Sequence, residues 1–132
     1  MVTTAQSTAP RTITAASGMI LPATITPQTD FNMMATAICL YHSFNERRTD
    51  YDTLEEVMMA MRDGSAVVVL YTDAQGEQAA RVLWPSSITL SAENNICCKA
   101  YCTLRRQWKS FRIDRMAMTH ALTTPDDCET AA

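Results

Sequence analysis

The chain has 132 residues, a formal net charge of −3 and a hydrophobic fraction of 47%, which together fit one globular domain with some additional chain. Its five cysteines are an odd number, and with no secretory signal at the N-terminus they argue against a disulfide framework. The longest apolar run, at residues 33–41, is far shorter than the roughly 20 residues of a membrane span. We therefore expect a soluble, reduced, cytoplasmic protein that does not use a membrane.

Residues 1–29 are rich in threonine and proline, and Arg11 is their only charged side chain. No hydrophobic period is visible in this segment, so we expect a poorly ordered arm. A cleaved transit peptide is the alternative, although one arginine is few for such a segment.

Two helices are expected after this arm. Asp30 can cap a helix at residues 31–44, in which Met34, Ile38 and Tyr41 form an apolar stripe. The charged segment up to residue 52 is expected to be a connection, so that residues 30–52 precede the main domain. A second helix should start at the Thr-Leu-Glu-Glu capping box of residues 53–56, and Gly64 is placed to end it.

The hydrophobic period then changes from that of a helix to that of a strand. Five strands are expected, at residues 66–71, 77–84, 87–90, 96–104 and 108–114. Pro85 should end the second strand, because proline cannot donate to a strand ladder. A helical turn at 115–122 and a solvated acidic tail at 123–132 should follow. The prediction is an α+β fold, in which N-terminal helices precede a small five-stranded, strongly bent antiparallel sheet or barrel within residues 53–122.

Positive charge is concentrated in one part of the chain. Residues 81–115 hold seven of the eleven Lys and Arg but two of the fourteen acids, a net of +5, whereas the rest of the chain carries −8. Arginine forks match phosphate oxygens, and aromatic side chains such as Tyr101 and Trp108 could stack on bases if exposed. This concentration favours an anionic partner. The alternative is a solvated strand face paired with Asp52, Glu55 and Glu56.

Three segments between residues 54 and 116 occur in the order of a known family pattern. They are an apolar strand that ends in tyrosine, an Arg-x-x-x-Pro strand and a closing basic motif, here Val67-Val68-Val69-Leu70-Tyr71, Arg81-Val82-Leu83-Trp84-Pro85 and Lys109-Ser110-Phe111-Arg112-Ile113-Asp114-Arg115-Met116. In these features the chain resembles the WYL domain, which is found mainly in bacterial transcription regulators. The chain departs from the pattern at Ile96-Cys97-Cys98, which replaces Trp-Tyr-Leu, and at Lys109, which replaces the first arginine of the closing motif. An N-terminal helix-turn-helix is not recognisable in residues 1–50.

The resemblance implies an SH3-like or Sm-like β-barrel that binds a nucleotide or single-stranded nucleic acid and acts as a sensor in transcription regulation. For this chain we expect a stand-alone regulatory module that modulates a partner protein or its own oligomer, such as a homodimer. Lys109 and Arg115 should share a strand face with Phe111 and Ile113, with Arg112 on the opposite face. The predicted ligand-binding side chains are Arg81, Tyr101, Arg105, Lys109, Ser110, Arg112 and Arg115.

The main alternative function is a protein-interaction or dimerisation module without a nucleic-acid ligand. It would use the methionines of the two helices, which are Met33, Met34, Met58, Met59 and Met61. Trp84, beside a proline, is expected in the core rather than at a binding surface.

No metal, cofactor or enzymatic activity is expected. Cys97 and Cys98 should point to opposite faces of one strand and so cannot easily share an ion. His42 and His120 are isolated, without a Ser or Cys nucleophile pattern around them. Three glycines are too few for a Gly-rich phosphate loop.

Overall fold

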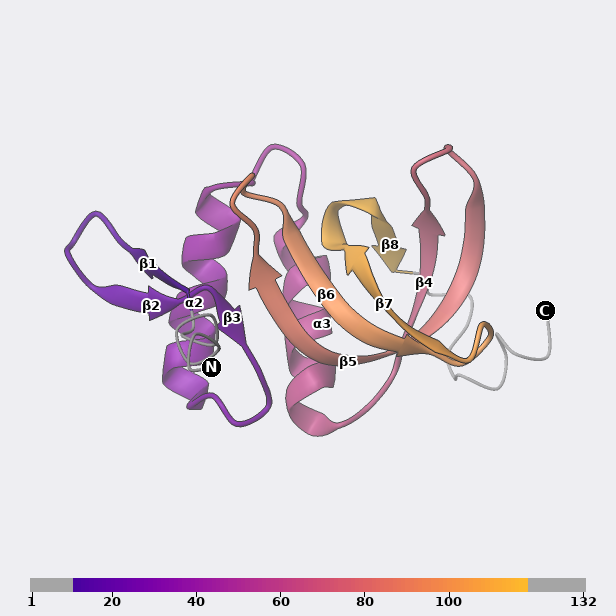
Figure 1. Cartoon of the computed structure of the whole chain (residues 1–132), viewed down its shortest axis with the longest axis horizontal. Coiled ribbons are helices and arrows are strands. Elements are labelled where there is room, and N and C mark those ends of the chain that lie inside the picture. Colours follow the sequence, from indigo (N-terminus) through magenta and orange to yellow (C-terminus); the bar gives the residue numbers. More distant parts are fainter. Residues whose placement is uncertain (1–10, 119–132) are drawn as a thin grey trace, which may run out of the picture.

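The computed structural model describes residues 11–118, in which two helices lie side by side against one face of an antiparallel sheet (Figure 1). The helices are α2 (Phe31–Ser43) and α3 (Tyr51–Asp63). Helix α3 contacts the sheet through β4, β5 and β8, and α2 packs on α3 and on the N-terminal strand β2. The predicted α+β class is confirmed. None of the helices in this part of the chain is long and apolar enough to cross a membrane.

Both helices are capped by an aspartate. As predicted, the Asp30 carboxylate accepts hydrogen bonds from two backbone N–H groups in the first turn of α2. Helix α3 begins two residues earlier than predicted, because the carboxylate of Asp50 accepts hydrogen bonds from the backbone N–H and the hydroxyl of Thr53. Gly64 ends α3 at φ +72°, a left-handed conformation that glycine adopts without steric cost.

The main sheet is antiparallel, with the strand order β7-β6-β5-β4-β8 and with β3 also paired to β5. Its strands are β3 (Thr24–Ile25), β4 (Val67–Thr72), β5 (Gln78–Leu90), β6 (Ile96–Cys102), β7 (Gln107–Arg112) and β8 (Met116–Met118). Strand β5 is the hub, since its first half pairs with β4 and its second half pairs with β6 and β3. The sheet therefore has six strands rather than the five expected, and its hydrogen-bonded path does not close.

Pro85 does not end a strand. The segments expected as separate strands at 77–84 and 87–90 are one continuous strand, β5, with an irregular register between Pro85 and Ser87. A proline has no N–H to donate, and a bulge is the place in a ladder where that donor is not needed. The prediction was wrong because the sequence shows that Pro85 lacks an N–H donor, but it does not show that the pairing with β6 can continue past the missing donor through an irregular register.

The last predicted strand ends early. Strand β7 stops at Arg112, and a single 3₁₀ turn, η1 (Ile113–Arg115), leads into β8, which pairs with β4. The helical turn expected at 115–122 is thus replaced, as far as the structure describes it, by the end of η1 and by β8. Residues 119–122 and the tail at 123–132 lie outside the described residues.

The N-terminal arm carries strands where poor order was expected. Strands β1 (Thr12–Thr14) and β2 (Ile20–Pro22) form a small hairpin, and β3 joins the main sheet at Thr89 and Ile88 of β5. The Tyr41 hydroxyl donates a hydrogen bond to the Pro22 carbonyl, and the backbone N–H of Leu90 donates to the Ala23 carbonyl at 2.8 Å. These strands are too short to show a period, so the sequence did not reveal them; residues 1–10 lie outside the described part.

The core lies between the two helices and the inner face of the sheet. Side chains from every layer meet there, including Ile25, Ile38, Leu54, Leu83 and Ile113. The helical methionines divide: three are buried, whereas Met33 is 41% exposed and Met59 packs at the border of the core. The buried ones are Met34, Met58 and Met61. The methionines therefore do not form one exposed surface, which removes most of the interface that the alternative function proposed.

Candidate anion-binding site

Two adjoining cavities lie where the β4–β5 hairpin approaches β7. The smaller has a volume of about 150 Å³ and the larger about 270 Å³, and they share Tyr71, Asp73, Lys109 and Phe111 in their walls. We call the two cavities together the Tyr71 site. The smaller is completed by Arg81, Cys102 and Arg105; the larger is completed by Ala74, Gln75, Ser110 and Arg115.

Strand register explains why cations from distant parts of the chain meet here. Arg81 of β5 is paired with Val69 of β4, and Lys109 of β7 is paired with Ala100 of β6. Val69 and Ala100 are buried on the inner face, so their partners Arg81 and Lys109 also belong to that face. Figure 1 shows that the helices cover the other end of the sheet, while the β4–β5 hairpin and the β6–β7 turn extend past them.

Tyr71 fixes the wall of the site. Its ring packs edge-to-face on Phe111, with the ring centroids 5.1 Å apart and the planes at 90°. Its hydroxyl oxygen accepts a hydrogen bond of 3.1 Å from the backbone N–H of Arg112, at the end of β7. The tyrosine thereby joins β4 to the start of η1 and leaves the cations on either side of an aromatic wall.

The cations of the Tyr71 site have no acidic partner among the described residues. Arg81, Arg105, Lys109 and Arg115 all line the cavities, and the three ion pairs found in residues 11–118 involve other side chains. One carboxylate lines the site, that of Asp73, and its Oδ1 accepts hydrogen bonds of 2.9 Å from the backbone N–H groups of two residues in its own turn. Among the described residues, four cations and one carboxylate therefore line the site, and its local charge is net positive.

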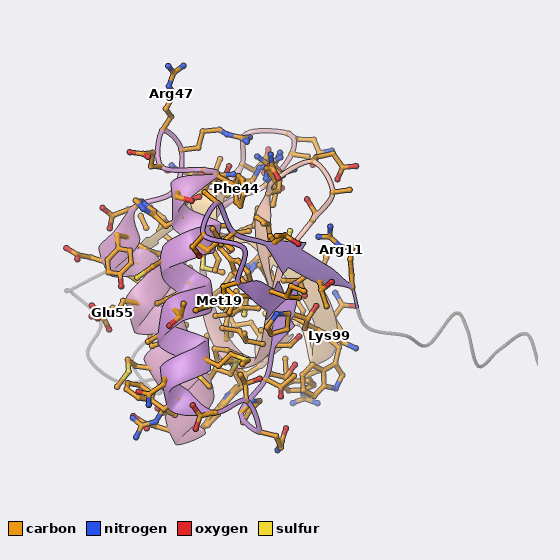
Figure 2. The ribbon with its side chains drawn as sticks, turned by 90° about the vertical axis from the view of Figure 1, so that its left-hand side faces the viewer. Arg11, Met19, Phe44, Arg47, Glu55 and Lys99 are labelled. Atoms are coloured by element: carbon orange, nitrogen blue, oxygen red, sulfur yellow. The ribbon has the colours of Figure 1, made fainter. Side chains whose placement is uncertain are left out.

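The acids suggested as an alternative partner for the arginines lie elsewhere. Asp52, Glu55 and Glu56 line a different cavity of about 560 Å³ between α3 and β8. Figure 2 shows Glu55 and Lys99 at opposite sides of the molecule, with the acidic helix on one side and the sheet on the other. In the part of the chain that the structure describes, these acids form no ion pair with the basic segment.

A model of the WYL domain matches residues 52–120, which is just over half of the chain. The chain belongs to the WYL domain family. A search of curated proteins found no match to it. Within this WYL domain, the matched segment contains α3, the strands β4 to β8 and the entire Tyr71 site, whereas α2 and the N-terminal strands precede it.

The WYL domain brings together most of the predicted binding residues but not all of them. Arg81, Arg105, Lys109, Ser110 and Arg115 line the Tyr71 site. The two others are placed differently: the Arg112 guanidinium is engaged by Asp114, and Tyr101 pairs with Trp108 on the outer face of the sheet.

Several wall residues of the Tyr71 site are not evident from the sequence. The sequence predicts that Tyr71 packs with its hydroxyl at a rim, and that Asp73, Ala74 and Gln75 form an ordinary turn. The sequence did offer one signal for this wall, namely a tyrosine at the end of an apolar strand. A tyrosine in that position needs a hydrogen-bond partner for its hydroxyl near the strand end. Nothing in the sequence indicates that the turn approaches β7.

The cysteines of the described residues differ in burial and form no metal-binding cluster there. Cys98 and Cys102 are buried, Cys97 is half-buried, and Cys39 is exposed. Burial raises the pKa of Cys98 to about 12, so that its thiol stays protonated at neutral pH. Among residues 11–118 there is no group of three or more His, Cys, Asp or Glu that could hold a metal ion.

Proposed function

We propose that this WYL domain is a regulatory module that binds a nucleotide or single-stranded nucleic acid at the Tyr71 site. The observation that carries the proposal is the group of four cations, Arg81, Arg105, Lys109 and Arg115, around two adjoining cavities without an ion-pair partner among the described residues. Folding alone gives no reason to gather these charges, because like charges at one site repel each other.

The chemistry of the site suits phosphate. Each arginine offers a planar fork of N–H donors that can hold two phosphate oxygens, and Lys109 supplies a point charge. Ser110 also contributes to the wall of the larger cavity. The cavities are small, so they suit the phosphate and sugar of a ligand better than a whole nucleotide buried on all sides.

The contacts of Tyr71 suggest how ligand binding could alter the surface that a partner protein contacts. The tyrosine bonds to the backbone of Arg112, and the next residues form η1 and then β8, which pairs with β4. We infer that this return of the last strand to β4 makes the sheet an open version of an SH3-like or Sm-like barrel. A ligand held by Arg115 of η1 and by Arg81 of β5 would stabilise one position of η1, and so bias the surface offered to a partner or to a second copy.

We further infer that the module binds without catalysis and without a cofactor. His42, the histidine in the described part of the chain, has its Nε2 within 2.9 Å of the Thr49 carbonyl and packs on Tyr51, which gives it a structural role. His120 lies outside the described residues. Among the described residues, the Tyr71 site contains no histidine, and its cysteine, Cys102, is buried.

Binding of a fluorescently labelled oligothymidylate, followed by anisotropy over a range of salt concentrations, tests the proposal. Contact with four cations predicts a log–log salt slope of about −3, from roughly 0.7 per phosphate on single strands. The double variant Arg81→Gln/Arg115→Gln should bind more weakly, with a slope shallower by about 1.4. The control is Arg106→Asn, because Arg106 is exposed and lines neither cavity. Unchanged affinity and slope in the double variant would contradict the proposal.

A second candidate function is dimerisation, and a set of exposed apolar side chains that differs from the predicted group of helical methionines favours it. Exposed large hydrophobics lie on α2 and on the β1–β2 hairpin, namely Met19, Ile20, Phe31, Met33 and Phe44. Figure 2 shows Met19 and Phe44 along the outward side of α2. If the domain forms a dimer through this surface, light scattering should report dissociation on Met33→Lys, while oligothymidylate binding should be unaffected.

A further inference from the structure

The outer face of the sheet, opposite the helices, carries a row of three aromatic side chains. Trp84 of β5 is paired with Tyr101 of β6, and Tyr101 is paired with Trp108 of β7. The Tyr101 and Trp108 ring centroids are 5.5 Å apart with the planes at 66°. Trp84 is 40% exposed, Trp108 is 56% exposed and Tyr101 between them is half-buried, so both indole rings are accessible. The expectation that Trp84 lies in the core was wrong.

The neighbouring row on the same face is polar and positive. Register pairs Ser87 with Lys99 and Lys99 with Ser110, so that Lys99 stands between two serines across the sheet. Lys99 is exposed and forms none of the ion pairs of residues 11–118. The strands β5, β6 and β7 contain no Asp or Glu at any position. The accessible neighbours of the aromatic rings in this row are thus one cation and two serines.

These neighbours indicate which partner the row fits. On one side the row adjoins Val82, but Val82 is itself buried with Val68 in a small apolar cluster. The accessible neighbours on the other side are serine and lysine, whereas a docked apolar protein surface would be matched by exposed aliphatic side chains. A second copy seated on this face would bring like charges together at Lys99. Single-stranded nucleic acid offers what the face lacks, which is flat bases for the rings and phosphates for the ammonium and hydroxyl groups.

We propose that Trp84, Tyr101 and Trp108 form a base-stacking platform for single-stranded nucleic acid, with Lys99 and Ser110 beside it to receive a phosphate. Adjacent strands are about 4.8 Å apart, so the three rings span about 10 Å, which is room for one or two bases. The proposal deepens the proposed function, since it rests on the same class of ligand. The platform is nevertheless a separate surface, on the opposite face of the sheet from Arg81 and Lys109.

Tryptophan fluorescence reads this platform directly, because the two tryptophans of the chain are both in it. Unlabelled oligothymidylate should quench the emission in a saturable manner as thymine stacks on the indole rings. Inorganic polyphosphate, which has the charge but no bases, should bind at the Tyr71 site and leave the emission nearly unchanged. Two results would overturn the platform. One is equal quenching by oligothymidylate and polyphosphate, and the other is the absence of quenching when oligothymidylate is bound.

Four variants separate stacking from other effects. Trp108→Ala and Tyr101→Ala should each weaken oligothymidylate binding by about 5- to 150-fold, the range measured for removing one stacked base. Trp108→Phe keeps a ring and should retain most of the affinity. Phe44→Ala removes an exposed ring on the helical side and should change nothing. Because Trp108 is exposed, its variants should keep the wild-type circular dichroism spectrum.

The outcomes also separate this platform from the Tyr71 site. If Trp108→Ala keeps its oligothymidylate affinity while Arg81→Gln/Arg115→Gln loses it, the platform is wrong and the proposed function stands. If the arginine variant binds normally and Trp108→Ala does not, the platform stands and the Tyr71 site is wrong. If light scattering shows a dimer that Trp108→Ala dissociates, without quenching by oligothymidylate, the face is an interface between copies and the proposal falls.

Discussion

Arg112 and Asp114 form a two-point ion pair, in which Arg112 Nε lies 3.0 Å from Asp114 Oδ1 and Arg112 Nη2 lies 2.7 Å from Asp114 Oδ2. Arg48 Nη1 approaches the same carboxylate at 3.9 Å. The hydrogen bond to Asp114 raises the pKa of Arg112. The guanidinium is thus engaged within the fold, which explains why the most obvious arginine of the closing motif does not line the Tyr71 site.

Asp114→Asn should destabilise the domain by about 1.5–3 kcal/mol, the range for hydrogen bonds that involve charged groups. The side chain of Asp114 is 9% exposed, so water can replace little of what is lost. The matched control is Asp63→Asn, which breaks an exposed pair with Arg62 and should cost less than about 1 kcal/mol. Urea denaturation measures both free energies of unfolding, and equal losses would show that the Arg112–Asp114 pair has no special role.

Gly64→Ala should destabilise the domain by about 1–2 kcal/mol, the cost of a left-handed conformation for a residue with a Cβ. The cost should be purely conformational, because a Cβ at Gly64 would meet no atom within 4 Å. The thermal midpoint checks this, and Gly64→Asn should lose less, since asparagine tolerates positive φ.

Arg106→Gly should act in the opposite direction. Arg106 has φ +54° in the β6–β7 turn, where a residue with a side chain is strained. Glycine relieves this strain but gains freedom in the unfolded chain, so we expect stabilisation of about 1 kcal/mol or less. A fall in the free energy of unfolding, measured in urea, would show that the Arg106 side chain stabilises the turn.

The helical methionines should differ sharply in their effect on stability. Met58→Ala removes a buried side chain from the core and should cost about 2–5 kcal/mol, whereas Met33→Ala on the exposed side of α2 should stay within about 0.5 kcal/mol. Urea denaturation of the two variants decides between a core and an interface role. A larger effect of Met33→Ala on the apparent stability, increasing with protein concentration, would instead indicate an interface at α2.

The stability of the domain should fall above pH 9. Burial raises the pKa of Cys98 from 9.0 to about 12 and also raises the pKa of Tyr41. The unfolded chain ionises the Cys98 thiol at its ordinary pKa while the folded chain resists, so this stabilisation is complete below pH 9 and is lost between pH 9 and 12. Urea denaturation at increasing pH should therefore show a shallower decline for Cys98→Ala than for the wild type, and parallel curves would refute the role of the buried thiol.

Much of the fold was predictable because its signals are local. Asp30 and Gly64 mark helix ends through their own chemistry, and the two-residue period of a strand is enough to place Lys109 on the same face as Phe111. The placement of Trp84 was not predictable, because Leu83 and Trp84 are adjacent and both apolar. Only the docking of α3 on the inner face decides that Leu83 is buried and that Trp84 is not.

The candidate site was predictable in its charge but not in its membership. The excess of cations over acids in residues 81–115 indicated an anionic ligand, and the residues around Arg115 supplied the family pattern. Which cations stay free depends on pairings that the sequence does not specify, such as the fork between Arg112 and Asp114. The part played by Tyr71 depends on a contact with Arg112, 41 positions away in the chain.

Strand β5 pairs with β3, which lies before the family match, and with β4 and β6, which lie within it. This pairing determines which part of the chain can be transferred as one folded unit. The family match begins at residue 52, yet β3 pairs with the second half of β5, and Ile25, Met34, Ile38 and Tyr41 share one core with the matched segment. A fragment cut at residue 52 would leave the end of β5 without its β3 neighbour and an apolar hollow where α2 had been. A fusion, a domain exchange or a minimal fragment for crystallisation should therefore start ahead of β2 rather than at the family boundary.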